Sequence, residues 1–109
     1  FFKADKQALA RFMASLAAVS PIRKIEDIDG PVGVAHAYDL MHILARAIDL
    51  AGSTDRKAVR DALEKLRQHR GLVKVYAPPF APGRHEALSA RELLIARYRA
   101  DGVLVPSAD

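Results

Sequence analysis

Apolar residues recur at helical spacing through much of the chain, and they are densest in residues 31–51. We expect one long helix there, beginning within 32–35, ending near Ala51 and stopped by a left-handed Gly52. An apolar stripe is expected to face the core, formed by Val34, Tyr38, Met41, Leu44, Ala45 and Ile48. Three further residues widen the stripe: Ala37, Leu40 and Ala47. A helix this apolar is usually covered on more than one side. The pattern predicts an exposed apolar surface if these 109 residues stand alone.

Two shorter amphipathic helices are predicted on either side of the long one. Residues 2–18 carry apolar side chains three and four positions apart, and a Ser-Pro pair prevents this helix from continuing. We expect Ser53 or Thr54 to cap the third helix, Asp55 to lie in its first turn, and Gly71 to end it. Its apolar stripe is narrow: Val59, Ala62, Leu63 and Leu66.

The last third of the chain predicts strands. Residues 72–76 are a short strand candidate, and the proline-rich residues 77–83 form a loop. Apolar runs on both sides of Asp101-Gly102 indicate a hairpin. The alternative is a helix over residues 89–99, because Ser89 and Glu92 have the spacing of a capping box.

Length and composition limit the possible organisation. A chain of 109 residues is a single domain or a fragment, with a helical part over 1–71 and strands, proline loop and terminal hairpin over 72–109. The strands resemble additions to a sheet that the chain does not fully supply. The first residues lack a starting Met and the pattern of a signal peptide, so we expect a processed protein or a fragment.

Charge and cysteine content exclude several classes of function. The net charge is +4, with 17 basic residues interleaved with 13 acidic ones, and we interpret this as a solvated surface and expect no nucleic-acid partner. The absence of Cys excludes disulfides, thiol catalysis and cysteine zinc sites. No uncharged apolar run is long enough to span a bilayer.

One polar series interrupts the long helix. His36, Asp39 and His42 lie three residues apart, and two imidazoles with a carboxylate are possible ligands for Zn²⁺. Arg46 and Asp49 continue the series, however, and the two histidines are splayed around the helix axis. A polar stripe on an otherwise buried helix is therefore the favoured interpretation, and a metal-binding protein using these three residues remains an alternative.

Catalytic motifs are missing from the sequence. Arg84, His85 and Glu86 follow the proline loop, but neighbouring residues rarely converge on one substrate atom, so we interpret them as contacts that anchor the loop. There is no nucleophile elbow, no His-Glu-x-x-His and no phosphate-binding glycine loop. We expect no enzyme activity, no catalytic residue and no cofactor.

Several motifs together resemble a known family. They are A-x-A-Y-D-L (35–40), A-G-S-x-D (51–55), V-R-D-A-L-E (59–64), Y-A-P-P-F-x-P-x-R-H-E-A-L (76–88) and I-A-R-Y-x-A-D-G-x-L-V-P (95–106). In this order the chain is similar, over roughly residues 30–106, to the C-terminal portion of type I periplasmic solute-binding proteins, the leucine/isoleucine/valine-binding relatives that serve ABC transporters.

The resemblance implies an α/β fold and a transport function. Members of the family consist of two α/β lobes that close on a small solute, and they deliver it to a membrane permease. This chain would be the C-terminal part of that fold: three helices followed by short strands and a terminal hairpin. The implied function is extracytoplasmic, in the periplasm, as the non-catalytic binding component of an ABC importer for an amino acid or a related branched or aromatic carboxylate. The implied partners are the solute, the permease, and the remainder of the binding protein or a second copy of this chain.

The resemblance also suggests a ligand site. The turn that leads into the long helix borders the cleft in such proteins, which places Gly33 and Val34, and with less support Ala35 and Ala37, near the ligand. Small residues there would leave room for a bulky solute, and a helix N-terminus favours a carboxylate. A self-associating helical interaction domain without a small-molecule ligand is the other alternative.

Overall fold

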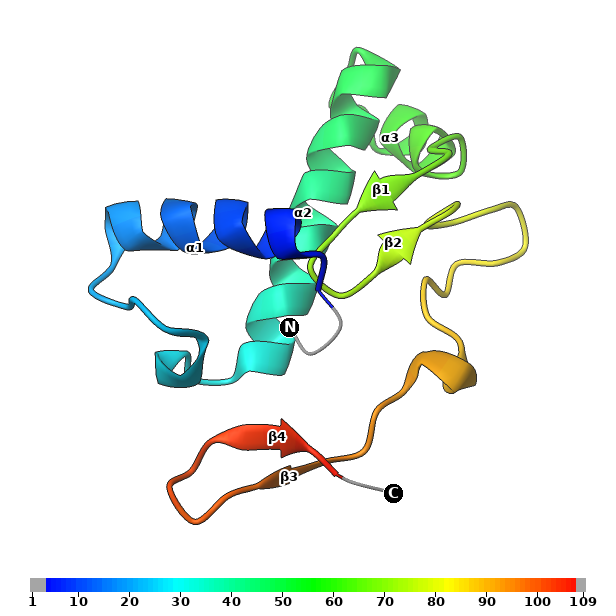
Figure 1. Ribbon diagram of the computed structural model, residues 1–109. Coiled ribbons are helices and arrows are strands. Elements are labelled where there is room, and N and C mark those ends of the chain that lie inside the picture. The colour runs from blue at the N-terminus through cyan, green and yellow to red at the C-terminus, as the bar shows by residue number, and fades with distance from the viewer. Residues whose placement is uncertain (1–3, 108–109) are drawn as a thin grey trace.

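The computed structural model describes residues 4–107 as three helices and two small antiparallel sheets (Figure 1). The helices are α1 (Lys6–Val19), α2 (Pro31–Ala51) and α3 (Arg56–Leu63), and the strands are β1 (His69–Arg70), β2 (Val75–Tyr76), β3 (Ala96–Tyr98) and β4 (Leu104–Pro106). Short 3-10 turns occupy Ile25–Asp27 and Ala90–Glu92. The expected mixture of helices and strands is confirmed at this level.

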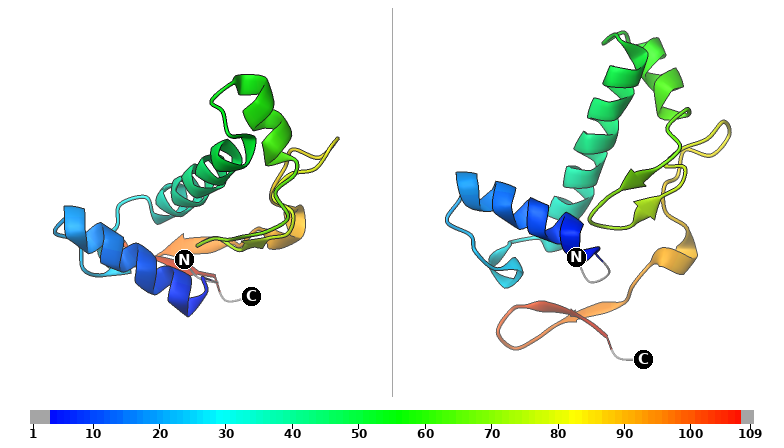
Figure 2. Two further views of the ribbon diagram at one scale, coloured as in Figure 1. Left: turned by 90° about the horizontal axis from the view of Figure 1, so that it is seen from above. Right: turned by 45° about the horizontal axis from the view of Figure 1, so that its top comes forward.

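The helix α2 is the central element: α1 crosses it, α3 lies beside its C-terminal half, and the β3–β4 hairpin lies beyond its N-terminal end (Figures 1 and 2). It begins at Pro31, just before the predicted range, because a proline at the first helical position sacrifices no intrahelical hydrogen bond. Gly52 ends it with φ of 60°, and its N–H donates to the carbonyls of Ile48 and Asp49 at 2.9 and 3.2 Å. The predicted end near Ala51 and the glycine stop are confirmed.

The helix α1 crosses α2 near the N-terminal half of α2 (Figure 1). It begins at Lys6, later than predicted, because the Asp5 carboxylate accepts hydrogen bonds from the N–H groups of Gln7 and Ala8, both at 3.0 Å. The predicted start at residue 2 lies outside the described residues. Phe12 meets Tyr38 of α2 edge to face, with ring centroids 5.1 Å apart. Around this contact, one core cluster unites both helices with the connector and the β1–β2 turn: Ala8, Phe12, Ile28, Ala35 and Leu72.

The helix α3 is shorter than the sequence predicts. Asp55 is its N-cap, accepting from the Ala58 N–H at 2.9 Å, and Ser53 supports the Asp55 N–H instead of capping the helix. The helix ends at Leu63, so the prediction that it continues to Gly71 is wrong. Residues 69–70 pair with β2, and this tertiary pairing prevails over local helix propensity. The predicted apolar stripe does contribute to a second cluster, where Ala62 and Leu66 are buried with Ile43, Ala47 and Tyr76.

The strands form two separate two-stranded sheets. β1 pairs with β2, and Val75–Tyr76 is shorter than the strand predicted over 72–76. β3 and β4 form the predicted hairpin around Asp101-Gly102, with Arg97 opposite Val105. The alternative helix over 89–99 is wrong. Its capping box between Ser89 and Glu92 does exist, but only the 3-10 turn Ala90–Glu92 follows it.

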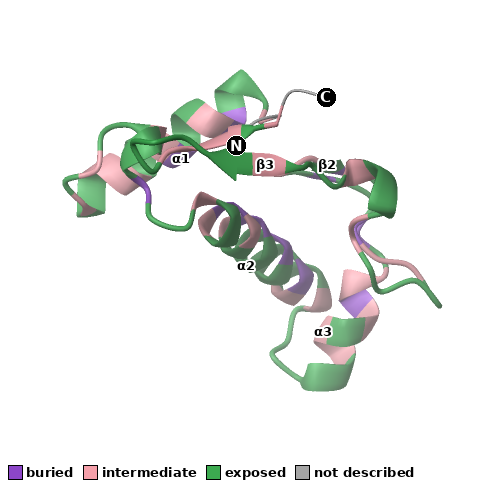
Figure 3. Ribbon diagram, turned by 90° about the horizontal axis from the view of Figure 1, so that it is seen from below, coloured by how far each residue is buried: buried purple, intermediate pink, exposed green. Residues whose placement is uncertain are grey.

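The residues that α2 buries and those that it exposes differ from the prediction. The residues it buries against its own chain lie four apart: Ala35, Asp39, Ile43 and Ala47. Large apolar residues on its other side stay exposed, with exposed fractions of 64% for Met41, 51% for Leu40 and 38% for Leu44 (Figure 3). The predicted core-facing side is thus partly wrong, and the predicted exposed apolar surface is confirmed. Asp39 does not lie with the other members of the predicted polar stripe on the helix surface, because it is fully buried.

Candidate functional site

A cavity of about 690 Å³ lies between the N-terminal end of α2 and the β3–β4 hairpin. One side is built by the connector and the first turn of α2, including Ile28, Val32 and Ala35. The hairpin supplies the opposite side, with Tyr98 and Val105 among its residues. Cavities of this size with mainly apolar walls are typical binding sites for small organic molecules.

The sequence explains why these elements meet at this place. Gly30 adopts φ of 62°, a left-handed conformation that glycine reaches without strain, and this turns the connector into Pro31 at the start of α2. Ile28 is buried in the first core cluster, so the connector is fixed directly beside the helix start. The N–H groups of a first helical turn have no partner within the helix. The cavity therefore borders a helix end that favours an anionic group.

The cavity is lined by five acidic or basic side chains: Glu26, Asp29, His36, Glu92 and Arg99. Two of them, Glu92 and Arg99, form ion pairs with neighbouring residues. Hydrogen bonds from Lys74 and from Ser89 lower the pKa of Glu92 to about 2. The Arg99 guanidinium pairs with Asp101, and this hydrogen bond raises the pKa of Arg99.

Of the four ligand residues expected from the resemblance, one lines the cavity and three do not. Ala35 lines the cavity. Val34 packs against the first core cluster, while Gly33 and Ala37 are exposed on the helix surface. Sequence reasoning missed the contributions of the connector and the hairpin, because only the folded chain brings residues 25–29 and 96–106 together.

The series His36, Asp39 and His42 does not converge on one point. His36 lines the cavity, and the His42 Nδ1 lies 2.9 Å from the Tyr38 carbonyl oxygen. Within residues 4–107, no group of three His, Asp or Glu side chains is arranged to hold a metal ion.

Asp39 instead fastens the β1–β2 turn to α2. Its carboxylate accepts hydrogen bonds from the N–H groups of Leu72 at 2.6 Å and Val73 at 2.8 Å, and from the Tyr76 hydroxyl at 3.1 Å. Gly71 allows this approach, since a Cβ there would overlap the carboxylate. Burial, the charge of Asp39 and this hydrogen bond raise the pKa of Tyr76. Val73 also lines the cavity, so Asp39 positions part of the cavity wall.

A second contact between α2 and the β1 region lies next to the first. The Arg46 guanidinium donates to the Gln68 carbonyl, and it lies 3.5 Å from the Nδ1 of His69. The His69 ring is buried, with the rings of His42 and Tyr76 at centroid distances of 6.4 and 6.0 Å. Burial is the main reason that the pKa of His69 is lowered, and the charge of Arg46 adds to it, while Asp39 opposes the shift.

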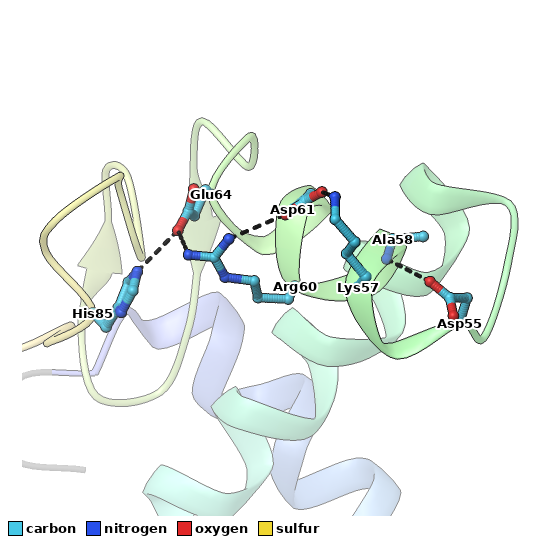
Figure 4. Close-up of polar contacts among 7 residues, drawn as sticks. All are labelled: Asp55, Lys57, Ala58, Arg60, Asp61, Glu64 and His85. Atoms are coloured by element: carbon cyan, nitrogen blue, oxygen red, sulfur yellow. Dashed lines mark hydrogen bonds and ion pairs between the residues drawn. The ribbon is translucent and has the colours of Figure 1, made fainter.

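The residues after the proline loop anchor it, as predicted. Arg84 donates to the carbonyls of Pro78 at 3.0 Å and Glu86 at 2.8 Å. His85 lies 2.9 Å from the carboxylate of Glu64, which also pairs with Arg60 at 3.1 Å (Figure 4). These bonds connect the loop to α3 at a point away from the cavity.

Comparisons with known proteins do not identify a family. No family model matches the chain, and neither a curated protein nor a solved structure matches it. Among residues 4–107, no helix is long and apolar enough to cross a membrane.

Proposed function

We propose that this chain is the C-terminal portion of a type I periplasmic solute-binding protein, the non-catalytic binding component of an ABC importer for amino acids or related small carboxylates. The motifs of residues 35–106 support the proposal. The observation that carries it is the cavity beside the first turn of α2, because that is where the resemblance expects the solute.

The chemistry of the cavity fits an amino acid. Its carboxylate would lie against the first turn of α2, where backbone N–H groups lack intrahelical partners. Its ammonium group would face Glu26 and Asp29, for which no hydrogen bond or ion pair is found among residues 4–107. A branched or aromatic side chain would contact the apolar walls around Ile28 and Val105. Lobe closure would then follow from tighter binding to the closed state.

The exposed surfaces of the chain support the same proposal. The apolar side of α2 around Met41 and Leu44, and the two isolated two-stranded sheets, would be covered by the remainder of the binding protein. Sheets of two strands are marginal alone and gain stability from further strands or from packing against other elements. The proposed location is the periplasm, and the proposed partner is the membrane permease of the importer.

The test is an NMR titration of the chain with leucine, phenylalanine, the matching 2-oxo acid and the matching amine. We expect backbone amide shifts at Val32, Ala35 and Val105 with leucine or phenylalanine. Affinity near the millimolar range, about 4 kcal/mol, is expected because one side of the ligand stays uncovered. The oxo acid and the amine should each bind more weakly than the amino acid, since each lacks one charged group.

Two matched variants sharpen this test. Val32 and Leu50 are exposed by 55% and 54% on the same helix, but only Val32 lines the cavity. Val32→Glu places a negative charge beside the ligand carboxylate and should abolish the shifts, whereas Leu50→Glu should preserve them. Absence of cavity shifts with every solute, or equal loss in both variants, contradicts the proposal.

One observation favours a second candidate function, a self-associating interaction domain. Apolar residues of α2 follow a heptad spacing of three and four, and we call them the α2 seam: Val34, Ala37, Met41, Leu44, Ile48 and Ala51. The three in the middle, Ala37, Met41 and Leu44, are exposed, whereas Val34 and Ala51 pack against the two core clusters. No residue of the seam is charged, and the residues that flank it along the helix, Tyr38, Leu40, Ala45 and Ala47, are also uncharged. In a two-fold antiparallel pair, Met41 would face Leu44 of the second copy, and the small Ala37 would face its larger Ile48.

Cross-linking distinguishes this candidate from the first. The chain has no Cys, so the double variant Met41→Cys with Leu44→Cys introduces the only thiols. A specific antiparallel pair gives rapid, quantitative covalent dimers, while Val32→Cys with Leu50→Cys stays monomeric. If the double variant remains monomeric under oxidation, the seam does not pair with itself.

A further inference from the structure

The net positive charge of this protein belongs to one end of the chain. Five basic residues and one acidic residue precede Ile25, whereas residues 25–109 contain twelve of each. Residues 1–24 therefore carry a net charge of +4, and the three acidic residues Glu26, Asp27 and Asp29 follow them in the rest of the connector. The basic residues of this segment that lie together in space are Lys6, Arg23 and Lys24, so an electrostatic interaction with an anionic partner is expected where they meet.

A groove of about 410 Å³ runs between α1 and the connector, next to the Ile25–Asp27 turn. Lys6 stands on the α1 side, and Arg23 and Lys24 stand on the connector side. Between them, Leu9 and Met13 form an apolar floor that is itself packed on the first core cluster. The groove thus combines cations on both walls with a fixed apolar base.

The two lysines are available to a partner. Arg23 is used internally, since its guanidinium donates to the carbonyls of Ser20 at 2.6 Å and Ile22 at 2.9 Å and fixes the connector behind α1. The side-chain ammonium groups of Lys6 and Lys24 form no hydrogen bond or ion pair with any of residues 4–107, and both residues are exposed. The groove contains one acidic side chain, Glu26, against these three cations.

We propose that this groove is a docking site for an acidic polypeptide segment that also carries apolar side chains. Carboxylates of the partner would pair with Lys6 and Lys24, and an aliphatic side chain would contact Leu9 and Met13. Electrostatic complementarity of this kind mainly provides specificity and fast association, and the apolar contact adds affinity.

The shape of the groove favours a polypeptide over other anions. Small-molecule sites enclose most of their ligand, whereas this groove is shallow and open along one side. A membrane surface would require an apolar helix face free to insert. The apolar side of α1 points inward instead, with Ala8 and Phe12 buried. The proposal does not depend on the solute-binding function, because the groove shares only Ile25 and Glu26 with the cavity.

The experiment measures fluorescence anisotropy of a labelled peptide built of Glu-Leu-Leu-Glu repeats joined by Gly-Ser, and of a twin with Lys replacing Glu. We expect saturable binding of the acidic peptide that weakens as ionic strength rises, and little binding of the basic twin. The double variant Lys6→Glu with Lys24→Glu should weaken the acidic peptide about tenfold or more and strengthen the basic twin. Ala10→Glu, at an exposed position in the groove, should weaken the acidic peptide further.

A matched control separates the groove from general charge. Lys65→Glu with Arg67→Glu produces the same net charge at two residues after α3, whose side chains form no hydrogen bond or ion pair within residues 4–107. This control should lose little affinity, and circular dichroism should show unchanged helix content in both double variants. Equal losses in both, or no binding of the acidic peptide, overturn the proposal. Binding to phosphatidylserine vesicles without binding of the peptide would also overturn it, in favour of a membrane surface.

Discussion

The substitution Asp39→Asn tests the contact that joins α2 to the β1–β2 turn. The carboxylate accepts two backbone N–H bonds and the Tyr76 hydroxyl in a fully buried position. An amide keeps the shape but has a single acceptor oxygen, so its NH₂ group must face a backbone N–H. One charge-assisted bond is then lost and one buried donor is left unsatisfied.

The size of this effect follows from ordinary hydrogen-bond energies. A bond to a charged group contributes about 1.5–3 kcal/mol, and an unsatisfied buried donor costs about 1–3 kcal/mol. Both values include part of the same desolvation cost, so they cannot simply be added. We therefore expect a loss of about 3 kcal/mol in the free energy of unfolding. For a domain of this size that corresponds to a decrease of about 10–20 °C in Tm.

Urea denaturation followed by circular dichroism measures the loss, with Asp49→Asn as the control. Asp49 lies on the same helix, but its side chain is exposed, so its variant should stay within about 0.5 kcal/mol of the parent. Tyr76→Phe removes only the hydroxyl bond and should cost about 1 kcal/mol. If Asp39→Asn unfolds at the same urea concentration as Asp49→Asn, the buried carboxylate does not hold the turn and the reasoning is refuted.

Three further predictions concern neighbouring features. Gly71→Ala should destabilise the chain by about 2–4 kcal/mol, because its Cβ overlaps Asp39, and the loss should shrink in an Asp39→Ala background when both are measured as a double-mutant cycle. The lowered pKa of His69 means that the unfolded chain takes up its proton first, so stability falls as pH decreases below about 6.5; His69→Gln should flatten urea midpoints measured between pH 7.5 and 5. Met41→Lys should leave the unfolding free energy within about 0.5 kcal/mol, since the side chain is exposed, yet reduce binding of an apolar dye.

The helix α2 shows which part of the fold could be read from the sequence. Its length and its end depend on local properties: an apolar period, a proline at the start and a glycine at the end. Which side of it faces the rest of the chain was not readable, because the apolar residues cover most of its circumference. Packing against α1, α3 and the β1–β2 turn selected the side with Ala35 and Ala47, whose small side chains let other elements approach closely.

The end of α3 shows how a tertiary contact overrides local preference. Residues 64–70 have good helix formers and a following Gly71, which predicted a longer helix. In the folded chain Arg46 binds the Gln68 carbonyl, and residues 69–70 pair with β2. A single hydrogen bond from a residue distant in sequence has no local signature, so this ending could not be predicted.

The candidate site, too, could be predicted only in part from the sequence. The turn leading into α2 was identified from the motif resemblance, and Ala35 does line the cavity. The connector and hairpin walls were not anticipated, and neither was the role of Asp39 in placing Val73, since these depend on residues far apart in the chain.

By itself, the sequence determined the local elements of this protein: the three helical segments, the Asp101-Gly102 hairpin, the capping box and the excess of apolar surface on the central helix. Those features depend on periodicity and on residues within a few positions of one another. Only the tertiary structure decided that Asp39 lies inside while Met41 lies outside, and where the cavity forms. Both outcomes arise from competition among distant segments for the same helix surface, and this competition has no counterpart in any short stretch of sequence.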